Sequence, residues 1–339
     1  MRTGNLPVCI KKSTMISADV FRRAVLGFFS PSGKRARLMV LTFHQVPLDP
    51  DPIAPGLPHS GVFAEQMRWL AAYCTVMPLL EAAQGLQENK LPARAACITF
   101  DDGYANNFDV AASILRECRL PAIFFVTAGA IEKGIMWNDL VIEGIRVGSH
   151  DLSLKDLGFG EYRLTDDTSR RTAINDIITK LKYKELAARW AIAESIYSQA
   201  TGKSPPRLMM TTEQVAGLGT QGFDIGAHTM NHPILKELSP NDARHEIEAS
   251  RIWVGDVTGS KPMAFAYPNG RPGIDFDTSH EKMACEAGFQ VAVSTRWACA
   301  KRTDSLFALP RFTPWERDKH GFWLRLAKTA VRSYIGGGD

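Results

Sequence analysis

The sequence predicts an α/β fold, a distorted (β/α)7-type barrel with a helical insertion. Three observations lead to this expectation. Short apolar runs of strand length alternate with helical patterns, which indicates parallel strands joined by helical crossovers. Polar residues able to carry chemistry follow several of these runs, as they do at the carboxyl ends of barrel strands. One long stretch, residues 130–205, breaks the rhythm and holds amphipathic helices instead.

The first half of the chain alternates between the two hydrophobic periodicities. Continuous apolar runs predict buried strands, and apolar residues three or four positions apart predict the helices between them. The expected elements are strands over 38–44, 95–100 and 122–127 and helices over 61–74 and 108–118.

Residues 130–205 contain two amphipathic helical patterns and no convincing buried strand. Because this stretch separates the two halves of one proposed site, we interpret it as an insertion in the barrel. Trp137, Asp139 and the helices of 165–200 are expected to form a lid or substrate wall, or else a purely structural elaboration. The expected apolar faces are Ile174, Ile177, Ile178 and Leu181 on one helix and Leu186, Trp190 and Ile196 on the other.

The second half of the chain resumes the alternation. Thr211 to Gln214 is a capping-box pattern that opens a helix. Ser239 followed by Pro240 opens another, which we expect to end near Gly259. The remaining expected strands cover 223–227, 262–267, 289–294 and 306–311. We therefore divide the chain into a leader (1–37), the barrel with its insertion (38–315) and a C-terminal helix and tail (316–339).

The composition is that of an ordinary globular protein. Of the 339 residues, 45% are hydrophobic and 22% are charged. The net charge of +4 comes without a long basic run or an aromatic-interleaved basic patch, so we expect no nucleic-acid partner. The 6 cysteines are dispersed and form no CxxC pair, which argues against a disulfide framework or a thiolate zinc site.

Two adjacent carboxylates, Asp101 and Asp102, end the apolar run at 95–100 and precede Gly103. An Asp-Gly pair is also common in ordinary turns. Neighbouring carboxylates repel each other, however, unless their roles are separated. A metal ion separates them by holding one carboxylate as a ligand and leaving the other free to accept a proton.

Two histidines, His228 and His232, follow the expected strand at 223–227. Alone, this pair is as compatible with a helix terminus and one buried imidazole as with a metal site. Combined with a carboxylate at another strand end, it predicts three protein ligands and an open coordination position. This is the arrangement of a hydrolytic metal site.

These residues resemble the motifs of the polysaccharide deacetylases, the NodB-homology carbohydrate esterases. Residues 99–103, Thr-Phe-Asp-Asp-Gly, resemble the first motif, and residues 228–232, His-Thr-Met-Asn-His, resemble the second. Residues 265–270, Phe-Ala-Tyr-Pro-Asn-Gly, are similar to the third motif of exopolysaccharide-type members. Residues 42–46, Thr-Phe-His-Gln-Val, resemble the segment that opens the domain in that subgroup, and residues 288–295 resemble the strand after motif three.

The resemblance implies a NodB-type barrel that binds a divalent metal ion, usually Zn²⁺. It also implies an enzyme that removes the acetyl group of an N-acetylated sugar. It implies that Asp101 is the general base and that Asp102, His228 and His232 bind the metal. The segment of Tyr267, Pro268 and Asn269 would contact the substrate, and the Asn269 N–H would bind the oxyanion.

The sequence departs from the family pattern at three places. Ala266 stands where the third motif usually has arginine, and Asn269 stands where it usually has an aromatic residue. No late Leu-x-His motif supplies a general acid. Arg311 is our candidate for the missing arginine, or else it forms a surface ion pair. His44 is our candidate for the acid or for a residue behind the metal ligands, or else it is a core histidine bonded to a backbone carbonyl.

We therefore expect a metal-dependent N-deacetylase acting on a bacterial cell-surface polysaccharide or its glycan precursor. A related amidase for cyclic imides or ureides is an alternative, although the intact Asp101 argues against it. A non-catalytic carbohydrate-binding relic is a third, although no expected ligand is missing.

The sequence contains no apolar run of transmembrane length, and the run at 24–29 is too short for a signal peptide. We expect a protein of the cytoplasm or one peripheral to the inner membrane. The basic amphipathic stretches 20–29 and 322–334 either contact a membrane surface or pack on the barrel. The sequence leaves the oligomeric state undetermined.

Overall fold

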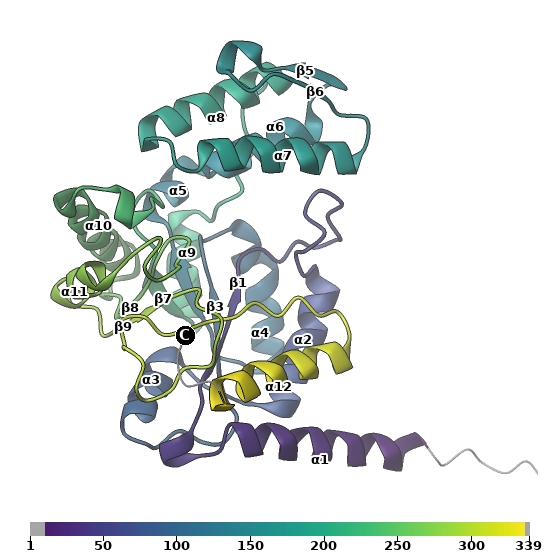
Figure 1. Cartoon of the computed structure of the whole chain (residues 1–339), viewed down its shortest axis with the longest axis vertical. Coiled ribbons are helices and arrows are strands. Elements are labelled where there is room, and N and C mark those ends of the chain that lie inside the picture. The colour runs from purple at the N-terminus through teal and green to yellow at the C-terminus, as the bar shows by residue number, and fades with distance from the viewer. Residues whose placement is uncertain (1–10, 336–339) are drawn as a thin grey trace, which may run out of the picture.

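A computed structural model describes residues 11–335 of the chain. A curled parallel sheet forms a half-barrel with helices on its outer side, and a separate group of helices lies above one end of it (Figure 1). The predicted α/β barrel with a helical insertion is thus confirmed.

The strands are β1 (Met39–Phe43), β2 (Thr75–Val76), β3 (Ala95–Phe100), β4 (Ile123–Val126), β5 (Asp151–Ser153), β6 (Glu161–Arg163), β7 (Asp224–Ala227), β8 (Ala264–Ala266) and β9 (Val291–Val293). The α-helices are α1 (Lys11–Phe29), α2 (Ser60–Tyr73), α3 (Leu79–Gln87), α4 (Ala112–Cys118), α5 (Ala128–Lys133), α6 (Trp137–Val147), α7 (Asp167–Leu181), α8 (Leu186–Thr201), α9 (Thr212–Thr220), α10 (Pro240–Thr258), α11 (Thr278–Glu286) and α12 (Lys319–Ile335). Short 3-10 turns occupy Gly33–Arg35, Lys155–Leu157 and Leu235–Glu237, and a π-helical turn, Asn107–Ala111, precedes α4.

The large sheet has 7 strands in the order β1-β3-β4-β7-β8-β9, with β2 paired to the start of β3. All these pairings are parallel, so the carboxyl ends of the strands meet at one end of the barrel. The residues after β1, β3, β7 and β8 therefore converge on one site.

Alternation along the strands separates two cores. On β3, Ile98 and Phe100 point outward and belong to the cluster beneath α2 and α4. Cys97 belongs to a second cluster, inside the barrel, together with Val40 of β1. Because side chains alternate along a strand, Thr99 and Asp101 follow Cys97 on the inner side. The strand thus delivers the Asp101 carboxylate into the mouth of the barrel.

The segment 306–312 closes the gap between β9 and β1, but it is not the regular strand that the sequence predicted. It forms only isolated bridges, Leu309 to Val293 and Phe312 to Leu41. The Leu309 N–H donates to Ala292 O, and the Phe312 N–H donates to Val40 O. Pro310 lies between them and has no N–H, so a continuous hydrogen-bond ladder cannot form there.

The insertion packs around its own apolar cluster, which includes Leu140 of α6, Ile177 of α7 and Ile196 of α8. The predicted face of α7 is buried except for Ile178, which is partly exposed. The face predicted for α8 is right at Ile196 but wrong at its first two residues. Leu186 and Trp190 remain partly exposed, whereas α8 buries Arg189, Ala193, Ile196 and Tyr197. A small hairpin of β5 and β6 also falls in this segment, with its short strands largely exposed.

Helices α1 and α12 pack on each other beneath the barrel, at the end opposite the insertion (Figure 1). The Lys319 ammonium of α12 lies 2.8 Å from the Asp19 carboxylate of α1. Val20, Phe21 and Phe28 of α1 are exposed. Within residues 11–335, no helix is both long and apolar enough to cross a membrane.

Candidate active site

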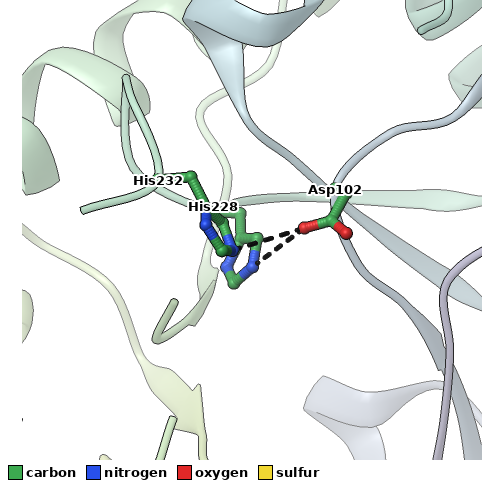
Figure 2. A group of neighbouring side chains, drawn as sticks. All are labelled: Asp102, His228 and His232. Atoms are coloured by element: carbon green, nitrogen blue, oxygen red, sulfur yellow. Dashed lines mark ion pairs between the residues drawn. The ribbon is translucent and has the colours of Figure 1, made fainter. Parts of the chain in front are cut away.

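Asp102, His228 and His232 meet at the carboxyl ends of β3 and β7. Their ligand atoms all lie within 4.8 Å of one another. Asp102 Oδ1 is 3.4 Å from His228 Nε2 and 3.5 Å from His232 Nε2, and both imidazoles face this one oxygen (Figure 2). Two segments more than a hundred residues apart thus supply one compact donor set.

The loops that carry these side chains take uncommon backbone conformations. Asp102 has φ 76°, Thr229 has φ 62° and His232 has φ 54°, all in the left-handed region that non-glycine residues seldom adopt. Such conformations persist only where the surroundings hold them, and they often mark functional sites.

A buried carboxylate of α10, Glu246, holds the second histidine loop in place. Its Oε2 accepts hydrogen bonds from the N–H groups of Met230 and Asn231 at 2.9 and 2.8 Å, and its Oε1 accepts one from Asn231 Nδ2. Thr229 Oγ1 accepts a hydrogen bond from the His232 N–H at 3.1 Å. The spacing of the two imidazoles is therefore fixed by this loop rather than by an α-helix.

His228 presents Nε2 to Asp102, and although burial opposes protonation, the Asp102 and Asp101 carboxylates raise the pKa of His228. His228 Nδ1 lies 2.7 Å from Ala266 O, and since a carbonyl oxygen only accepts, Nδ1 carries the proton. Such a hydrogen bond is the usual orienting contact of a metal-binding histidine. Burial lowers the pKa of His232 to about 4, although the Asp102 carboxylate opposes this shift. Its imidazole is therefore neutral at neutral pH, the state in which a histidine binds a metal ion.

The donor set fits a divalent ion such as zinc. Asp102 Oδ1 is buried and has no hydrogen-bond donor among the described residues. Leaving a buried carboxylate oxygen without a partner is costly, and a cation would satisfy it. Two ligand atoms each about 2.1 Å from a tetrahedral zinc ion lie about 3.4 Å apart. The carboxylate–imidazole separations of 3.4 and 3.5 Å agree with that spacing.

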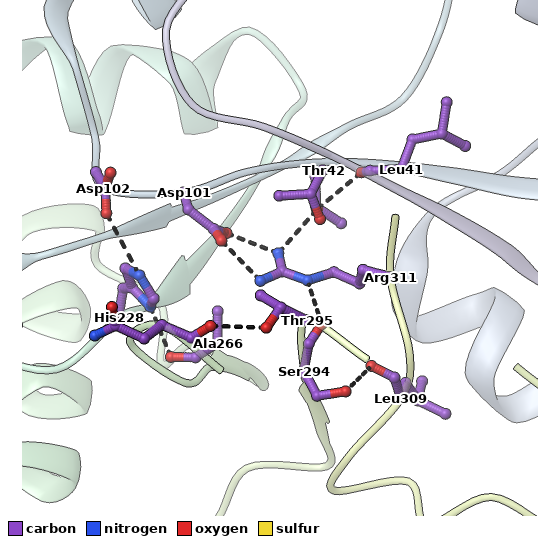
Figure 3. Close-up of polar contacts among 12 residues, drawn as sticks. Leu41, Thr42, Asp101, Asp102, His228, Ala266, Ser294, Thr295, Leu309 and Arg311 are labelled. Atoms are coloured by element: carbon purple, nitrogen blue, oxygen red, sulfur yellow. Dashed lines mark hydrogen bonds and ion pairs between the residues drawn. The ribbon is translucent and has the colours of Figure 1, made fainter. Parts of the chain in front are cut away.

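Asp101 is bound by Arg311, in the segment that closes the barrel. Arg311 Nη1 and Nη2 each donate to one Asp101 oxygen at 2.7 Å, and Arg311 Nε donates to Ser294 O at 3.0 Å (Figure 3). The side chains of Arg311 and Asp101 are only 1% and 3% exposed, so the alternative of a surface ion pair is wrong. Burial alone would raise the pKa of Asp101, but the charge and hydrogen bonds of Arg311, together with the charges of His228 and His44, outweigh it and hold that pKa below its usual value.

His44 follows β1 and is exposed at the rim of the barrel. The imidazole forms no hydrogen bond with any described residue, while the backbone oxygen of His44 accepts one from Asn107 Nδ2. The alternative of a core histidine bonded to a carbonyl is therefore wrong.

In the segment after β8, the Tyr267 side chain belongs to the core, whereas the backbone N–H of Asn269 is free, among the described residues, to contribute to the site. The Tyr267 ring is buried and stacks on Phe276 with centroids 3.7 Å apart, so the structure places this side chain in the core rather than against a substrate. Asn269 has φ 58°, and its carbonyl accepts a hydrogen bond from Thr295 Oγ1. Among the described residues, the N–H of Asn269 has no acceptor.

Sequence reasoning overlooked three polar residues around this site. Thr99 accepts a hydrogen bond from Arg311 Nη1 at 3.0 Å, and Glu246 holds the histidine loop. Arg189 of α8 is buried and lines a cleft together with Pro233, the residue after His232. Two of them carried a signal, since Glu246 and Arg189 each stand on the apolar face of a helix. A charged residue in such a position requires a partner.

The insertion also brings Asp139 to the site. Asp139 Oδ1 accepts a hydrogen bond from Tyr104 Oη at 3.2 Å, while its Oδ2 is buried without a partner among the described residues. Burial, and secondarily the negative charge of Asp102, raise the pKa of Asp139 to about 7.

Comparison with solved structures supports the fold assignment. The structure resembles Streptococcus pyogenes deacetylase PplD in complex with acetate, with a TM-score of 0.56 and 18% identity over 82% of this chain and 92% of that one. IcaB from Ammonifex degensii gives a TM-score of 0.56 and 18% identity over 89% and 98%. A de-N-acetylase from Aggregatibacter actinomycetemcomitans gives 0.51 and 17% over 81% and 94%.

Sequence comparison identifies the family. YxkH of Bacillus subtilis, whose name assigns it to the polysaccharide deacetylases, is 21% identical over 281 residues, which cover 82% of this chain and 71% of YxkH. The family model described as polysaccharide deacetylase matches residues 88–213 and 164–292, which together exceed half of the chain. The chain therefore belongs to the polysaccharide deacetylase family.

Proposed function

We propose that this protein is a metal-dependent N-deacetylase that acts on a bacterial cell-surface polysaccharide or its glycan precursor. One observation carries the proposal. The donor set of Asp102, His228 and His232 lies directly beside Asp101, a separate carboxylate whose ionised form Arg311 favours. A metal ligand set next to an ionised general base is what hydrolysis of an unactivated amide requires.

Asp102, His228 and His232 would hold the divalent ion, for which Zn²⁺ is our proposal. When bound, such an ion makes a nearby water more acidic and polarises the acetamide carbonyl. Asp101 would accept a proton from the water that attacks the carbonyl carbon. Arg311 donates to both Asp101 oxygens, so it fixes the carboxylate plane and favours the ionised form.

Two further groups complete the proposed reaction. The Asn269 N–H, unpaired among the described residues, would donate to the oxygen that becomes negative in the tetrahedral intermediate. Breakage of the C–N bond requires a proton on the departing amine, and His44 at the rim would deliver it. The products are acetate and the free amino sugar.

We propose an amide rather than an ester as the bond that is cleaved. The amine of an amide is a poor leaving group, so its hydrolysis needs both a general base and a general acid, and the proposed site contains both. The name of the Aggregatibacter structure, a de-N-acetylase, is in line with this choice. The alternative of a cyclic imide or ureide hydrolase is less well supported, because Asp101 is intact and paired with Arg311.

Release of acetate from an N-acetylglucosamine oligomer tests the proposal. We expect turnover that a chelator abolishes and that one equivalent of Zn²⁺ restores. Asp101→Asn should keep the metal and lose on the order of 10²–10⁴-fold in rate, the usual contribution of a positioned base. Acetate release that is indifferent to both the chelator and Asp101→Asn would refute this function.

A peripheral contact with an anionic lipid surface is a second part of the proposal, for which the exposed Val20, Phe21 and Phe28 of α1 provide the support. Co-sedimentation with anionic vesicles tests it, and a Phe21→Ser/Phe28→Ser variant should bind less. Equal binding by both proteins would exclude α1 as the contact.

A further inference from the structure

Arg189 is a buried arginine without a carboxylate partner. It lies on α8 of the insertion and is 4% exposed. Its Nη1 donates to the backbone oxygen of Lys182 at 3.0 Å, while its Nε is buried with no acceptor among the described residues. The same part of the chain offers no Asp or Glu oxygen within ion-pair distance of the guanidinium.

Such a charge is costly to bury unless something pairs with it. The guanidinium carbon lies 4.7 Å from the centroid of the Trp137 ring, and this cation–π contact offsets part of the cost. A ring face attracts the cation but accepts none of its directional N–H bonds. The planar donor edge of Arg189 is therefore left for a ligand, and planar donor pairs match carboxylates and phosphates.

The space beside Arg189 is a cleft between the insertion and the barrel. The cleft has a volume of about 270 Å³, and Lys182, Lys184 and Arg189 line it from the insertion side. Pro233 and Ile234 line it from the barrel side, and Pro233 directly follows the proposed ligand His232. The cleft therefore adjoins the metal-binding residues.

Three cations face this cleft together with two carboxylates. Glu185 is engaged elsewhere, because its oxygens accept hydrogen bonds from the N–H groups of Ala187 and Ala188 at the start of α8. Glu237 lies on the barrel side.

We propose that Arg189 binds an anionic group of the substrate, so that the enzyme acts on an N-acetylated sugar bearing a carboxylate or phosphate beside the acetamide. This inference rests on the proposed deacetylase function and narrows its substrate class to acidic glycans. The anion could be a uronic acid in the neighbouring position or a phosphate on the same sugar. Each of these groups has two oxygens that can accept hydrogen bonds from the unpaired N–H donors of Arg189.

Matched substrates test the proposal. Acetate release is measured for neutral N,N′-diacetylchitobiose, for a disaccharide of glucuronic acid and N-acetylglucosamine, and for N-acetylglucosamine 1-phosphate. We expect wild-type kcat/KM to be higher for at least one anionic substrate, and its identity distinguishes carboxylate from phosphate. Arg189→Met should lose about 10- to 100-fold on that substrate, as expected for a charged hydrogen-bonded pair, and little on the neutral one. Arg189→Lys should recover part of the loss.

Arg163→Met is the matched control, because Arg163 also belongs to the insertion but its side chain is 83% exposed. Its kcat/KM values should equal those of the wild type on all three substrates. Equal losses on neutral and anionic substrates in Arg189→Met would overturn the proposal and indicate a structural arginine. A wild-type enzyme without any anionic preference would overturn it as well, while leaving the deacetylase function standing.

A binding measurement separates this proposal from the proposed function. Tryptophan fluorescence of the zinc-loaded protein is titrated with sodium glucuronate and with inorganic phosphate, with Trp137 as the reporter beside Arg189. We expect saturable quenching by one anion, at least 10-fold weaker in Arg189→Met. Anion binding to the metal itself would persist in that variant, so unchanged quenching would overturn the proposal. Failure of all acetate release together with Arg189-dependent quenching would defeat only the deacetylase function.

Discussion

The carboxylate of Asp101 and the guanidinium of Arg311 form two parallel hydrogen bonds of 2.7 Å, although 210 residues separate them in the chain. The family pattern has an arginine in the third motif, at the position where this chain has Ala266. Here the positive charge comes instead from the segment that closes the barrel. Arg311 thus pairs with Asp101 although it lies outside the third motif.

Arg311→Met should shift the pH dependence of turnover. Asp101 acts as a base only when ionised, and the Arg311 charge keeps its pKa below the usual value, so activity persists to low pH. Without that charge, burial raises the pKa, and the acidic limb of the kcat/KM profile should move to higher pH. The buried carboxylate left behind should also lower the free energy of unfolding by roughly 3–5 kcal/mol.

The control for this variant is Arg296→Met, which breaks a different Arg–Asp pair, with Asp304, without touching Asp101. It should leave the acidic limb in place. If Arg311→Met leaves that limb unmoved as well, Arg311 does not tune Asp101.

Removal of both imidazoles should abolish metal binding. The purified protein is expected to carry one divalent ion, and a His228→Ala/His232→Ala variant should carry close to none. Elemental analysis after dialysis measures the stoichiometry directly. A control at His280, which is buried in the capping box of α11, should retain the metal. Retention of one ion by the double variant would place the site elsewhere.

His44→Ala should separate amide from ester hydrolysis. An amine leaves only with a proton, whereas an activated phenol acetate departs without one. The variant should therefore lose most of its turnover on the amide, keep its metal and lose much less on the ester. Equal losses on both substrates would point to a structural role, and normal rates on both would remove His44 from the site.

Asp139→Asn should stabilise the protein at alkaline pH. The pKa of Asp139 is about 7 in the fold against 3.8 ordinarily, so the folded state binds this proton more tightly than the unfolded chain. Its stabilising contribution is present below pH 4 and is lost as the pH rises through about 7. By pH 8 the loss amounts to about 4 kcal/mol.

Asparagine stays neutral and still accepts the Tyr104 hydrogen bond. In chelator, the Tm of Asp139→Asn should therefore exceed that of the wild type at pH 8 and match it at pH 4. A Tm difference that is the same at both values would show that Asp139 does not titrate between them.

Much of the barrel could be predicted because strand signals are local. The apolar run 95–100 coincides with β3, and the capping box at Thr211 opens α9 as expected. Parallel topology then brings the residues after β3 and β7 together, so Asp102, His228 and His232 could be grouped before their distances were known. Arg311 could be proposed as the partner of Asp101 because the family motif lacked its arginine.

The features that were not predicted depend on tertiary packing, which the local patterns of a single sequence do not reveal. The segment 306–312 has the apolar content of a strand, but its pairing is interrupted at Pro310. The face of α8 was misjudged because Leu186 and Trp190 are apolar, whereas the helix buries Arg189. The hydrophobic pattern identifies helices well, but it assigns a charged residue such as arginine to the solvent-exposed face. The cleft that the buried Arg189 lines was therefore not predicted.

The closing segment makes the orientation of Asp101 dependent on a seam of the barrel that is held by isolated bridges instead of a regular strand. Between β9 and β1 the wall is held by a few backbone hydrogen bonds, among them those of Leu309 and Phe312 with their neighbours. Arg311 lies between these two residues, so any fraying of the seam withdraws the guanidinium from Asp101 before the other strands separate. Local opening of this segment would then abolish the activity while the rest of the fold stays intact. Under mild denaturant, catalysis should therefore fail at a lower concentration than the circular dichroism of the helices.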